Sequence, residues 1–417
     1  MRESRPSHAA AGGADLLAWP RAGSGLVTIA CHVPRAAPET EADAGLAALA
    51  LRSAARGAGG LDARGIALAF ERLGGSLLSS AGPDLVGYST TVLAEHLDEA
   101  ARLLALVLDA PAFDPASVDR ERAVLLTESE QVRDDMGRWP LLLALRGAFG
   151  PRGYGLPVAG LPGSLAGLDA ARARAWHRAA FGGRRTVVLT GDAGLEALLD
   201  AGRRVAAGAA PDGEGLAAGA DGWTALPGPA EHVERRARAQ TAIAMVFPGP
   251  SRADPRRRAG DVWAAIAGGL GGRMFEALRS ARSLAYNVVA GSLQRRHGGR
   301  LTAYLATSPA REAEAREAMS AELERFRTAP PSAAEVSRAM GFLAGQAQVS
   351  RQRTAALANE LLDAWLRGTG LGELEDPAAA YRAVTAEEVW EVAQALGTRE
   401  AAVGIVRGTA QGAAPGA

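Results

Sequence analysis

Apolar residues in the first half of the chain recur with two different periods, which predict short strands and longer helices. β-rich runs of alternating character predict strands over residues 26–33, 76–80, 85–92 and 186–190. Runs with helical spacing predict helices over residues 45–57, 65–73, 95–108, 117–135 and 193–205. Strands and helices therefore share one segment of about 200 residues, as in an α+β domain.

The second half of the chain repeats this plan. Its strand patterns cover residues 240–247, 286–293, 300–307 and 402–406. Its helical patterns cover residues 258–267, 311–326, 332–348, 354–366 and 386–396. Because the order of elements recurs, we expect an internal duplication. The predicted fold class is α+β, with two homologous domains that each pack helices on one face of a mostly antiparallel sheet.

A stretch rich in Ala, Gly, Pro and Asp separates the two halves. It covers residues 206–230 and has the composition of a linker. We expect an N-terminal α+β domain over residues 17–205 and a C-terminal α+β domain over residues 231–410. Residues 1–16 are expected to form a disordered arm, and residues 411–417 a tail.

Composition narrows the possible partners and locations. The 417 residues carry no formal net charge and have a sequence pI of about 7.1, so we expect no binding to nucleic acid or to an anionic membrane. The single cysteine, Cys31, excludes an intrachain disulfide and a thiolate metal cluster. The N-terminus lacks the apolar core of a signal peptide, and no apolar run approaches ~18 residues. A cytoplasmic chain without a membrane span is therefore expected.

Gly268–Tyr286 is the stretch with the most distinctive chemistry. A turn with four glycines precedes a helical segment that includes Arg279, and Tyr286 opens the strand that follows. Arginine offers a planar fork of donors, and tyrosine offers one hydroxyl on a rigid ring. Such a pair suits a peptide carbonyl or a developing oxyanion.

Other common catalytic arrangements are missing from the sequence. None of the six histidines lies at a ligand spacing from another; they are His8, His32, His96, His177, His232 and His297. The glycine-rich turn is not followed by the Lys of a phosphate-binding loop, and no G-x-S-x-G elbow is present. An independent enzyme with another chemistry therefore finds no support.

The glycine-rich turn followed by "LR" and "LAY" resembles the second half of the pitrilysin/insulinase family of zinc peptidases, the inverzincins. The resemblance implies a fold of the processing-peptidase type, shared with LuxS. It also implies that Arg279 and Tyr286 help to bind a peptide substrate.

The segment Gly45–Gly57 resembles the zinc helix of that family, but its chemistry is missing. In register with the family phrase G-L-A-H-L-L-E-H, the two histidine ligands fall on Ala48 and Arg52, and the general base falls on Leu51. The family's third ligand corresponds to Glu128, which lies 76 positions after Arg52. We expect no zinc in this chain, and Glu128 is either a partner of Arg52 in an ion pair or an acid on a helix surface.

The resemblance implies a non-catalytic subunit without activity of its own. A partner chain with the HxxEH motif would supply Zn and the general base, and this chain would supply Arg279 and Tyr286. The alternative is a structural or peptide-binding homologue without a role in proteolysis, like the family relatives that serve as core subunits of respiratory complexes.

Overall fold

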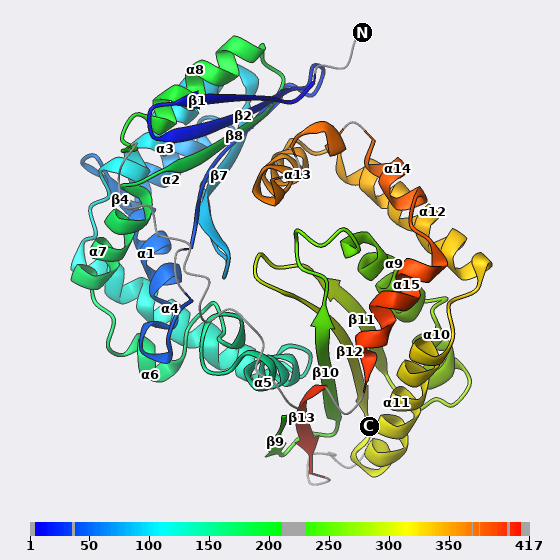
Figure 1. Cartoon of the computed structure of the whole chain (residues 1–417). Coiled ribbons are helices and arrows are strands. Elements are labelled where there is room, and N and C mark those ends of the chain that lie inside the picture. Colours follow the sequence, from blue (N-terminus) through cyan, green and yellow to red (C-terminus); the bar gives the residue numbers. More distant parts are fainter. Residues whose placement is uncertain are drawn as a thin grey trace. The chain divides into compact units, whose positions relative to one another are not determined.

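Within the described residues, the strands form two larger sheets and one two-stranded hairpin (Figure 1). The computed structural model describes residues 5–35, 38–210, 230–368, 370–374, 376–397 and 401–409, and leaves the Glu373 side chain undescribed. By their internal contacts, the described residues fall into two units. Unit 1 comprises those within residues 1–129, 157–220 and 348–376, and unit 2 comprises those within residues 130–156, 221–347 and 377–417.

Unit 1 is built on a six-stranded sheet with the order β1-β2-β8-β3-β7-β6, in which only the β2–β8 pair is parallel. Its strands are β1 (Ser7–Ala11), β2 (Ala14–Pro20), β3 (Leu26–Pro34), β6 (Leu78–Ala81), β7 (Leu85–Leu93) and β8 (Arg185–Gly191), beside the short pair β4 (Gly57–Ala58) and β5 (Leu61–Asp62). Its helices are α1 (Leu46–Ala54), α2 (Ala63–Glu71), α3 (Leu97–Asp109), most of α4 (Pro115–Asp134), α6 (Pro162–Leu165), α7 (Ala170–Phe181), α8 (Leu195–Ala206) and α13 (Thr354–Arg367).

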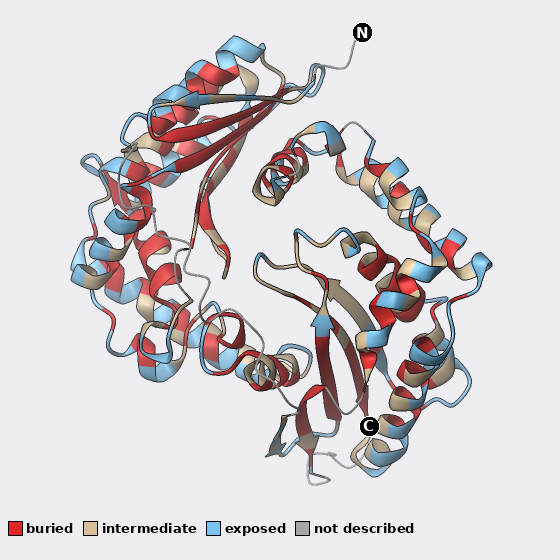
Figure 2. Ribbon diagram, viewed as in Figure 1, coloured by how far each residue is buried: buried red, intermediate tan, exposed pale blue. Residues whose placement is uncertain are grey.

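Alternation along the strands of unit 1 gives the sheet two apolar faces. One face, with Ile29 and Cys31 of β3, packs against α1, α3 and α8 in the main core. The other face, with Leu17 of β2 and Val188 of β8, packs against α13. Figure 2 shows the strands buried between these layers. Helix α13 therefore joins the first-half sheet although the second half of the sequence encodes it.

Unit 2 contains a five-stranded sheet with the order β11-β12-β10-β13-β9, in which only the β13–β9 pair is parallel. Its strands are β9 (Glu231–Arg236), β10 (Thr241–Gly249), β11 (Asn287–Leu293), β12 (Gly299–Thr307) and β13 (Ala402–Gly408). Its helices are α5 (Arg138–Phe149), α9 (Arg257–Gly268), α10 (Arg273–Phe275), α11 (Glu312–Thr328), most of α12 (Ala333–Ser350), α14 (Pro377–Arg382) and α15 (Ala386–Ala393). The α+β class with mostly antiparallel sheets is thus confirmed.

Both faces of the unit 2 sheet are also covered. Ile243 and Leu305 face the core formed with α9, α11 and α15. Ala244 and Tyr304 face the opposite side, where α5 packs. Gly404 of β13 is needed there, because a Cβ atom at this position would lie 1.9 Å from the carbonyl oxygen of Pro140. Each sheet therefore receives one helix on its second face from the other half of the sequence.

The N-terminal arm is a correction to the sequence prediction. Residues 7–11 and 14–20 form the paired strands β1 and β2 rather than a disordered segment. Gly12, with φ of +54°, and Gly13 supply the two-residue turn between them. Parallel pairing of β2 with β8 then fixes the hairpin to the sheet. Most of the expected linker and all of the expected tail lie outside the described residues.

The sequence analysis predicted no membrane span, and the length and hydropathy of the helices in the structure can be compared with that prediction. Among the described residues, no helix combines the length and the apolar character needed to cross a bilayer.

Candidate functional site

Helix α1 places Ala48 and Leu51 in the core of unit 1. These two residues stand at positions where the zinc helix of the resembling family carries a ligand and the general base. Every residue of α1 except Arg52 is buried. Ala48 is 4% exposed and Leu51 is fully buried. The apolar pattern that predicted this helix therefore continues through the positions where a zinc helix would carry ligands and a base.

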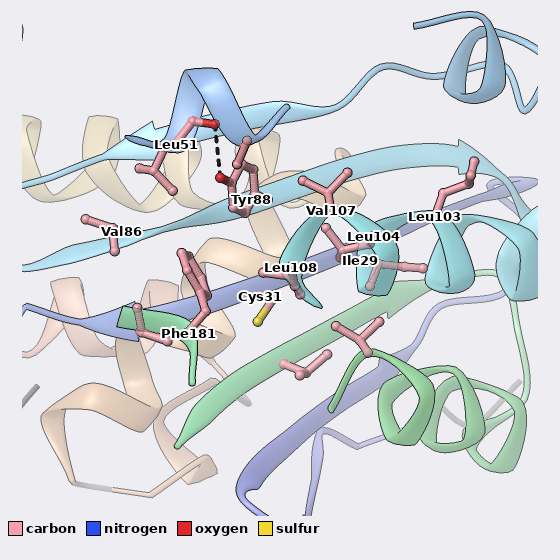
Figure 3. Close-up of a cluster of buried hydrophobic side chains, with 14 of the residues drawn as sticks. Ile29, Cys31, Leu51, Val86, Tyr88, Leu103, Leu104, Val107, Leu108 and Phe181 are labelled. Atoms are coloured by element: carbon pink, nitrogen blue, oxygen red, sulfur yellow. Dashed lines mark hydrogen bonds between the residues drawn. The ribbon is translucent and has the colours of Figure 1, made fainter. Parts of the chain in front are cut away.

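Leu51 belongs to a hydrophobic cluster that includes Val86, Tyr88 and Phe181 (Figure 3). The buried Tyr88 hydroxyl donates a hydrogen bond of 3.0 Å to the backbone carbonyl of Leu51. Burial raises the pKa of the Tyr88 phenol well above its ordinary value. The phenol therefore stays protonated and acts as a structural donor at this helix.

Arg52 and Glu128 form a two-point ion pair between α1 and α4. The Nη1–Oε1 distance is 2.8 Å and the Nη2–Oε2 distance is 2.7 Å. The hydrogen bonds to Glu128 raise the pKa of the Arg52 guanidinium. The Arg52 and Glu128 side chains are 31% and 37% exposed, so the pair is only partly shielded from water. Of the two alternatives for Glu128, the structure shows the ion pair with Arg52.

A second ion pair joins the turn that follows α1 to α4, and the sequence analysis did not find it. The Arg56 Nε atom lies 2.5 Å from Oε1 of Glu121, whose side chain is 7% exposed. Arg56 follows Arg52 by four positions in the sequence and lies in the turn after α1, while Glu121 and Glu128 are two turns apart on α4. That spacing was the signal available in the sequence.

The residues at this place do not fit a zinc ion. Zinc sites in proteins need several nitrogen, sulfur or carboxylate ligands around one point. Here a methyl group, a leucine and a guanidinium occupy the three helix positions, and the guanidinium takes both oxygens of Glu128. Across the described part of the chain, no group of three or more His, Cys, Asp or Glu residues is arranged to hold a metal.

Arg279 lies in a π-helical turn, Glu276–Ser280, that directly follows α10. Its guanidinium carbon is 5.2 Å from the centre of the Phe275 ring, in a cation–π arrangement. The Arg279 side chain is otherwise exposed. Stacking orients the guanidinium and leaves its donors available.

Tyr286 stands just before β11 at the edge of the unit 2 sheet. Its backbone N–H donates to the Ala306 carbonyl at 2.8 Å, and the residue is 62% exposed. Within the described part of the chain, neither a hydrogen bond nor a ring contact joins Tyr286 to Arg279. The structure therefore joins Arg52 to Glu128 by direct hydrogen bonds, whereas among the described residues Arg279 and Tyr286 form no hydrogen bond or ring contact with each other.

The helical segment after the glycine-rich turn is anchored by a contact that the sequence analysis missed. Arg273 forms hydrogen bonds of 2.5 and 2.7 Å to the two carboxylate oxygens of Glu335 at the start of α12. The same guanidinium lies 4.6 Å from the centre of the Phe326 ring. These bonds hold the pKa of the Glu335 carboxyl down at about 2. The segment that leads to Arg279 is thereby fixed at its first residue.

Comparison with known sequences matches two family models to most of the chain. Residues 36–146 match the insulinase model of Peptidase family M16, and residues 169–343 match the model described as Peptidase M16 inactive domain. An uncharacterized zinc protease of Streptomyces coelicolor is 26% identical over 80% of this chain and 74% of its own length. An uncharacterized zinc protease of Mycobacterium tuberculosis is 28% identical over 80% of this chain and 77% of its own length.

Solved structures with the same fold span nearly the whole chain. A peptidase M16 inactive domain from Pseudomonas fluorescens superimposes with a TM-score of 0.87 at 22% identity, covering 97% of this chain and 98% of that one. A protease from Helicobacter pylori gives 0.86 at 15% identity, over 97% and 99% of the two chains. A chain of Complex III2 from Candida albicans gives 0.76 at 15% identity, over 96% and 95%.

Proposed function

The chain belongs to the insulinase family, Peptidase family M16, as a member without the zinc-binding residues, and from this premise we propose that it is the non-catalytic subunit of a two-chain zinc metallopeptidase. A partner chain with an HxxEH motif supplies Zn and the general base. This chain supplies Arg279 and Tyr286, which hold the peptide substrate.

The exposed phenol of Tyr286 carries the proposal. A tyrosine that only supported the fold would bury its ring. Tyr286 is instead 62% exposed, although its backbone N–H is paired with the Ala306 carbonyl. Arg279 is exposed as well, and its stacking on Phe275 leaves the fork of donors available. Both groups are thus available to a peptide backbone.

The state of the zinc helix supports an auxiliary role. Leu51 is fully buried in the core, and the guanidinium of Arg52 donates hydrogen bonds to both carboxylate oxygens of Glu128. Neither residue can activate water, so proteolysis would depend on a second chain.

A cytoplasmic location is part of the proposal, and cell fractionation with an antibody to this chain tests it.

The test combines this chain with a candidate partner chain that carries the HxxEH motif and measures peptide cleavage. We expect Arg279→Ala to lower kcat/KM of the pair by about tenfold or more, because a charge-assisted hydrogen bond is lost. Tyr286→Phe removes one hydroxyl and is expected to cost about three- to tenfold. The matched control is Arg282→Ala, which removes an exposed arginine from the turn that follows the π-helical segment of Arg279.

The outcomes separate the proposal from its alternative. If Arg279→Ala and Tyr286→Phe match the Arg282→Ala control, the two residues have no role in substrate binding. The structural homologue is the second candidate, and the likeness to a chain of Complex III2 supports it. In that case the partner would cleave peptides equally well without this chain.

A further inference from the structure

One end of the unit 2 sheet keeps part of its second face open. Leu301 and Ala303 of β12 belong to the core formed with α9 and α11, so Arg300 and Thr302, which alternate with them, face the opposite side. Helix α5 packs on that side over β13, β10 and β9. Val289 of β11 lies on the same face by its register with β12 and is 46% exposed. The β11–β12 end of this face is therefore accessible.

Arg300 carries a positive charge that no carboxylate among the described residues balances. Its Nε atom is buried and forms no hydrogen bond with any described residue. Burial, together with the charge of Arg295, lowers the pKa of the guanidinium to about 10. Buried charges in proteins are normally paired, so an uncompensated guanidinium at this place indicates a site for an anion.

The outer part of the Arg300 guanidinium is open to a ligand. Within the described part of the chain, its two Nη atoms donate no hydrogen bond, and neither belongs to the buried polar atoms without a partner. Both Nη atoms therefore keep contact with solvent, in agreement with the partial exposure of the residue. Two donors in one plane match the two oxygens of a carboxylate.

An opening beside Arg300 provides space for such a group. Gly291 of β11 stands directly opposite Thr302 in the register of the two strands. A Cβ atom at Gly291 would meet nothing within 4 Å, and the φ angle there is one that other residues adopt freely. The missing side chain thus leaves a gap on this face between Val289 and Leu293. The hydroxyl of Thr302, which has no hydrogen-bond partner among the described residues, adds a second donor at the gap.

The opening lies on the same pair of strands as Tyr286. The Tyr286 backbone N–H donates to the Ala306 carbonyl, and Arg300 precedes Ala306 by six residues along β12. At about 3.4 Å per residue, the two places are about 20 Å apart. An extended peptide held at Tyr286 therefore reaches Arg300 with a residue about six positions away.

We propose that Arg300 and Thr302 bind a carboxylate of the peptide substrate and thereby select acidic peptides. This inference rests on the proposed function, because it extends the peptide site of Arg279 and Tyr286. The carboxylate belongs to an aspartate or glutamate about six residues from the position at Tyr286, or to the C-terminus of a peptide of matching length. A basic side chain at that position is disfavoured by the charge of Arg300.

Fluorescence polarisation with the full chain tests the proposal. The probes are alanine–serine peptides of about 12 residues, long enough to span both places, with an uncharged fluorophore on a blocked N-terminus. One series ends in an amide and carries a single glutamate at each position in turn, and a matched series carries glutamine instead. We expect the best glutamate peptide to bind at least about tenfold more tightly than its glutamine counterpart. A third series without acidic side chains ends in a free carboxylate, and a gain confined to it would assign the bound group to the peptide C-terminus.

Three variants make the result specific to the opening. Arg300→Gln should abolish the preference for glutamate, leave the glutamine peptide unaffected and not lower the melting temperature, because it removes a charge without a partner. Gly291→Val places a side chain in the gap at a strand position with room for it, and should reduce the preference about threefold or more. Arg338→Gln removes an exposed arginine on α12 and should change nothing.

Arg279→Ala separates this inference from the proposed function. If Arg279 holds the peptide backbone, its loss weakens the glutamate and glutamine peptides alike. Equal binding of the two peptides, or a preference that survives Arg300→Gln, would overturn acid selection and leave the backbone contact intact. If Arg279→Ala changes neither peptide while Arg300→Gln removes the preference, the proposed role of Arg279 is wrong and the acid site stands. Absence of saturable binding by every peptide would overturn both.

Discussion

Arg52 and Glu128 join α1 to α4 through two charge-assisted hydrogen bonds at 2.8 and 2.7 Å. Because about a third of each side chain is exposed, water screens the pair. We expect a double-mutant cycle of Arg52→Ala and Glu128→Ala, measured by urea unfolding, to give a coupling free energy of about 1 kcal/mol.

The neighbouring pair of Arg56 and Glu121 provides the comparison for this cycle. Glu121 is more deeply buried than Glu128, so removing Arg56 leaves a carboxylate with poorer access to water. Arg56→Ala should therefore destabilise the protein more than Arg52→Ala. Equal losses in the two variants would show that burial of the acid does not control the strength of these pairs.

Zinc binding can be restored at the same place by replacing two residues. In the variant Ala48→His with Arg52→His, two imidazoles one helical turn apart would face Glu128, which is released from its ion pair. We expect about one zinc per chain by metal analysis of the dialysed protein. Adding Glu128→Gln to this variant should reduce the bound zinc severalfold, and a folded double-histidine variant that binds no zinc would disprove the alignment of the helix.

Leu51 sets a limit on this reconstruction. A glutamate at this fully buried position would bring a carboxyl group into the cluster around Tyr88 and Val86. Burial of an unpaired carboxylate costs several kcal/mol or forces its protonation. The general base is therefore harder to restore than the metal ligands, which explains why the metal-binding variant leaves Leu51 unchanged.

At the scale of elements, the contact between Arg273 and Glu335 predicts a pH dependence. The carboxyl pKa of Glu335 is about 2 in the folded chain, below the ordinary value of 4.5. Its contribution to stability is thus fully present above pH 4.5 and is lost as the pH falls toward 2. Since the side chain is 26% exposed, we expect Glu335→Gln to lower the free energy of unfolding by about 1–2 kcal/mol at pH 7. The difference from the unchanged protein should shrink between pH 4.5 and 2 in urea titrations.

Glu388 is the matched control for this experiment. It occupies the same position in a helix-capping box, with the Thr385 backbone N–H donating to its carboxylate at 2.8 Å, but it has no arginine partner among the described residues. Glu388→Gln should cost less than Glu335→Gln at pH 7. If both variants lost the same free energy of unfolding, the effect of Glu335 would come from helix capping rather than from its ion pair with Arg273.

Local sequence pattern was sufficient for most elements but not for all of them. The apolar alternation of β3 and the helical spacing of α11 follow from the core that each one faces, so both were predictable. Strands β1 and β9 were missed because their exposed, alternating residues gain order only from pairing with neighbouring strands. The Arg52–Glu128 pair was predictable because a family spacing placed both residues, whereas Arg273 and Glu335 lie 62 positions apart without such a guide.

At the scale of the whole molecule, helices are exchanged between the two halves of the sequence. Helix α5 packs on the second-half sheet, and α13 packs on the first-half sheet. The backbone carbonyl of Thr354, at the start of α13, accepts a hydrogen bond from the Thr190 hydroxyl. The Thr354 hydroxyl oxygen lies 2.8 Å from the hydroxyl oxygen of Thr28. The sequence analysis predicted the helix α13 but no helix over residues 138–149, where α5 lies. An amphipathic pattern such as that of α13 states that a face is buried but not which sheet buries it. This part of the organisation therefore could not be predicted from one sequence.

Two leucine substitutions in the second half of the sequence should loosen different sheets. Leu361 of α13 and Leu323 of α11 are both fully buried, so replacing either one by alanine is expected to cost about 2–5 kcal/mol. Because Leu361 packs in the cluster of Leu17 and Val188, Leu361→Ala should accelerate amide hydrogen exchange in β3 and β8 of unit 1. Leu323→Ala should instead accelerate exchange in β10 and β12 of unit 2. Suppose instead that Leu361→Ala accelerated amide exchange in β10 and β12 and left β3 and β8 unchanged. The two halves of the sequence would then fold as separate domains, and the exchange of helices would not determine stability.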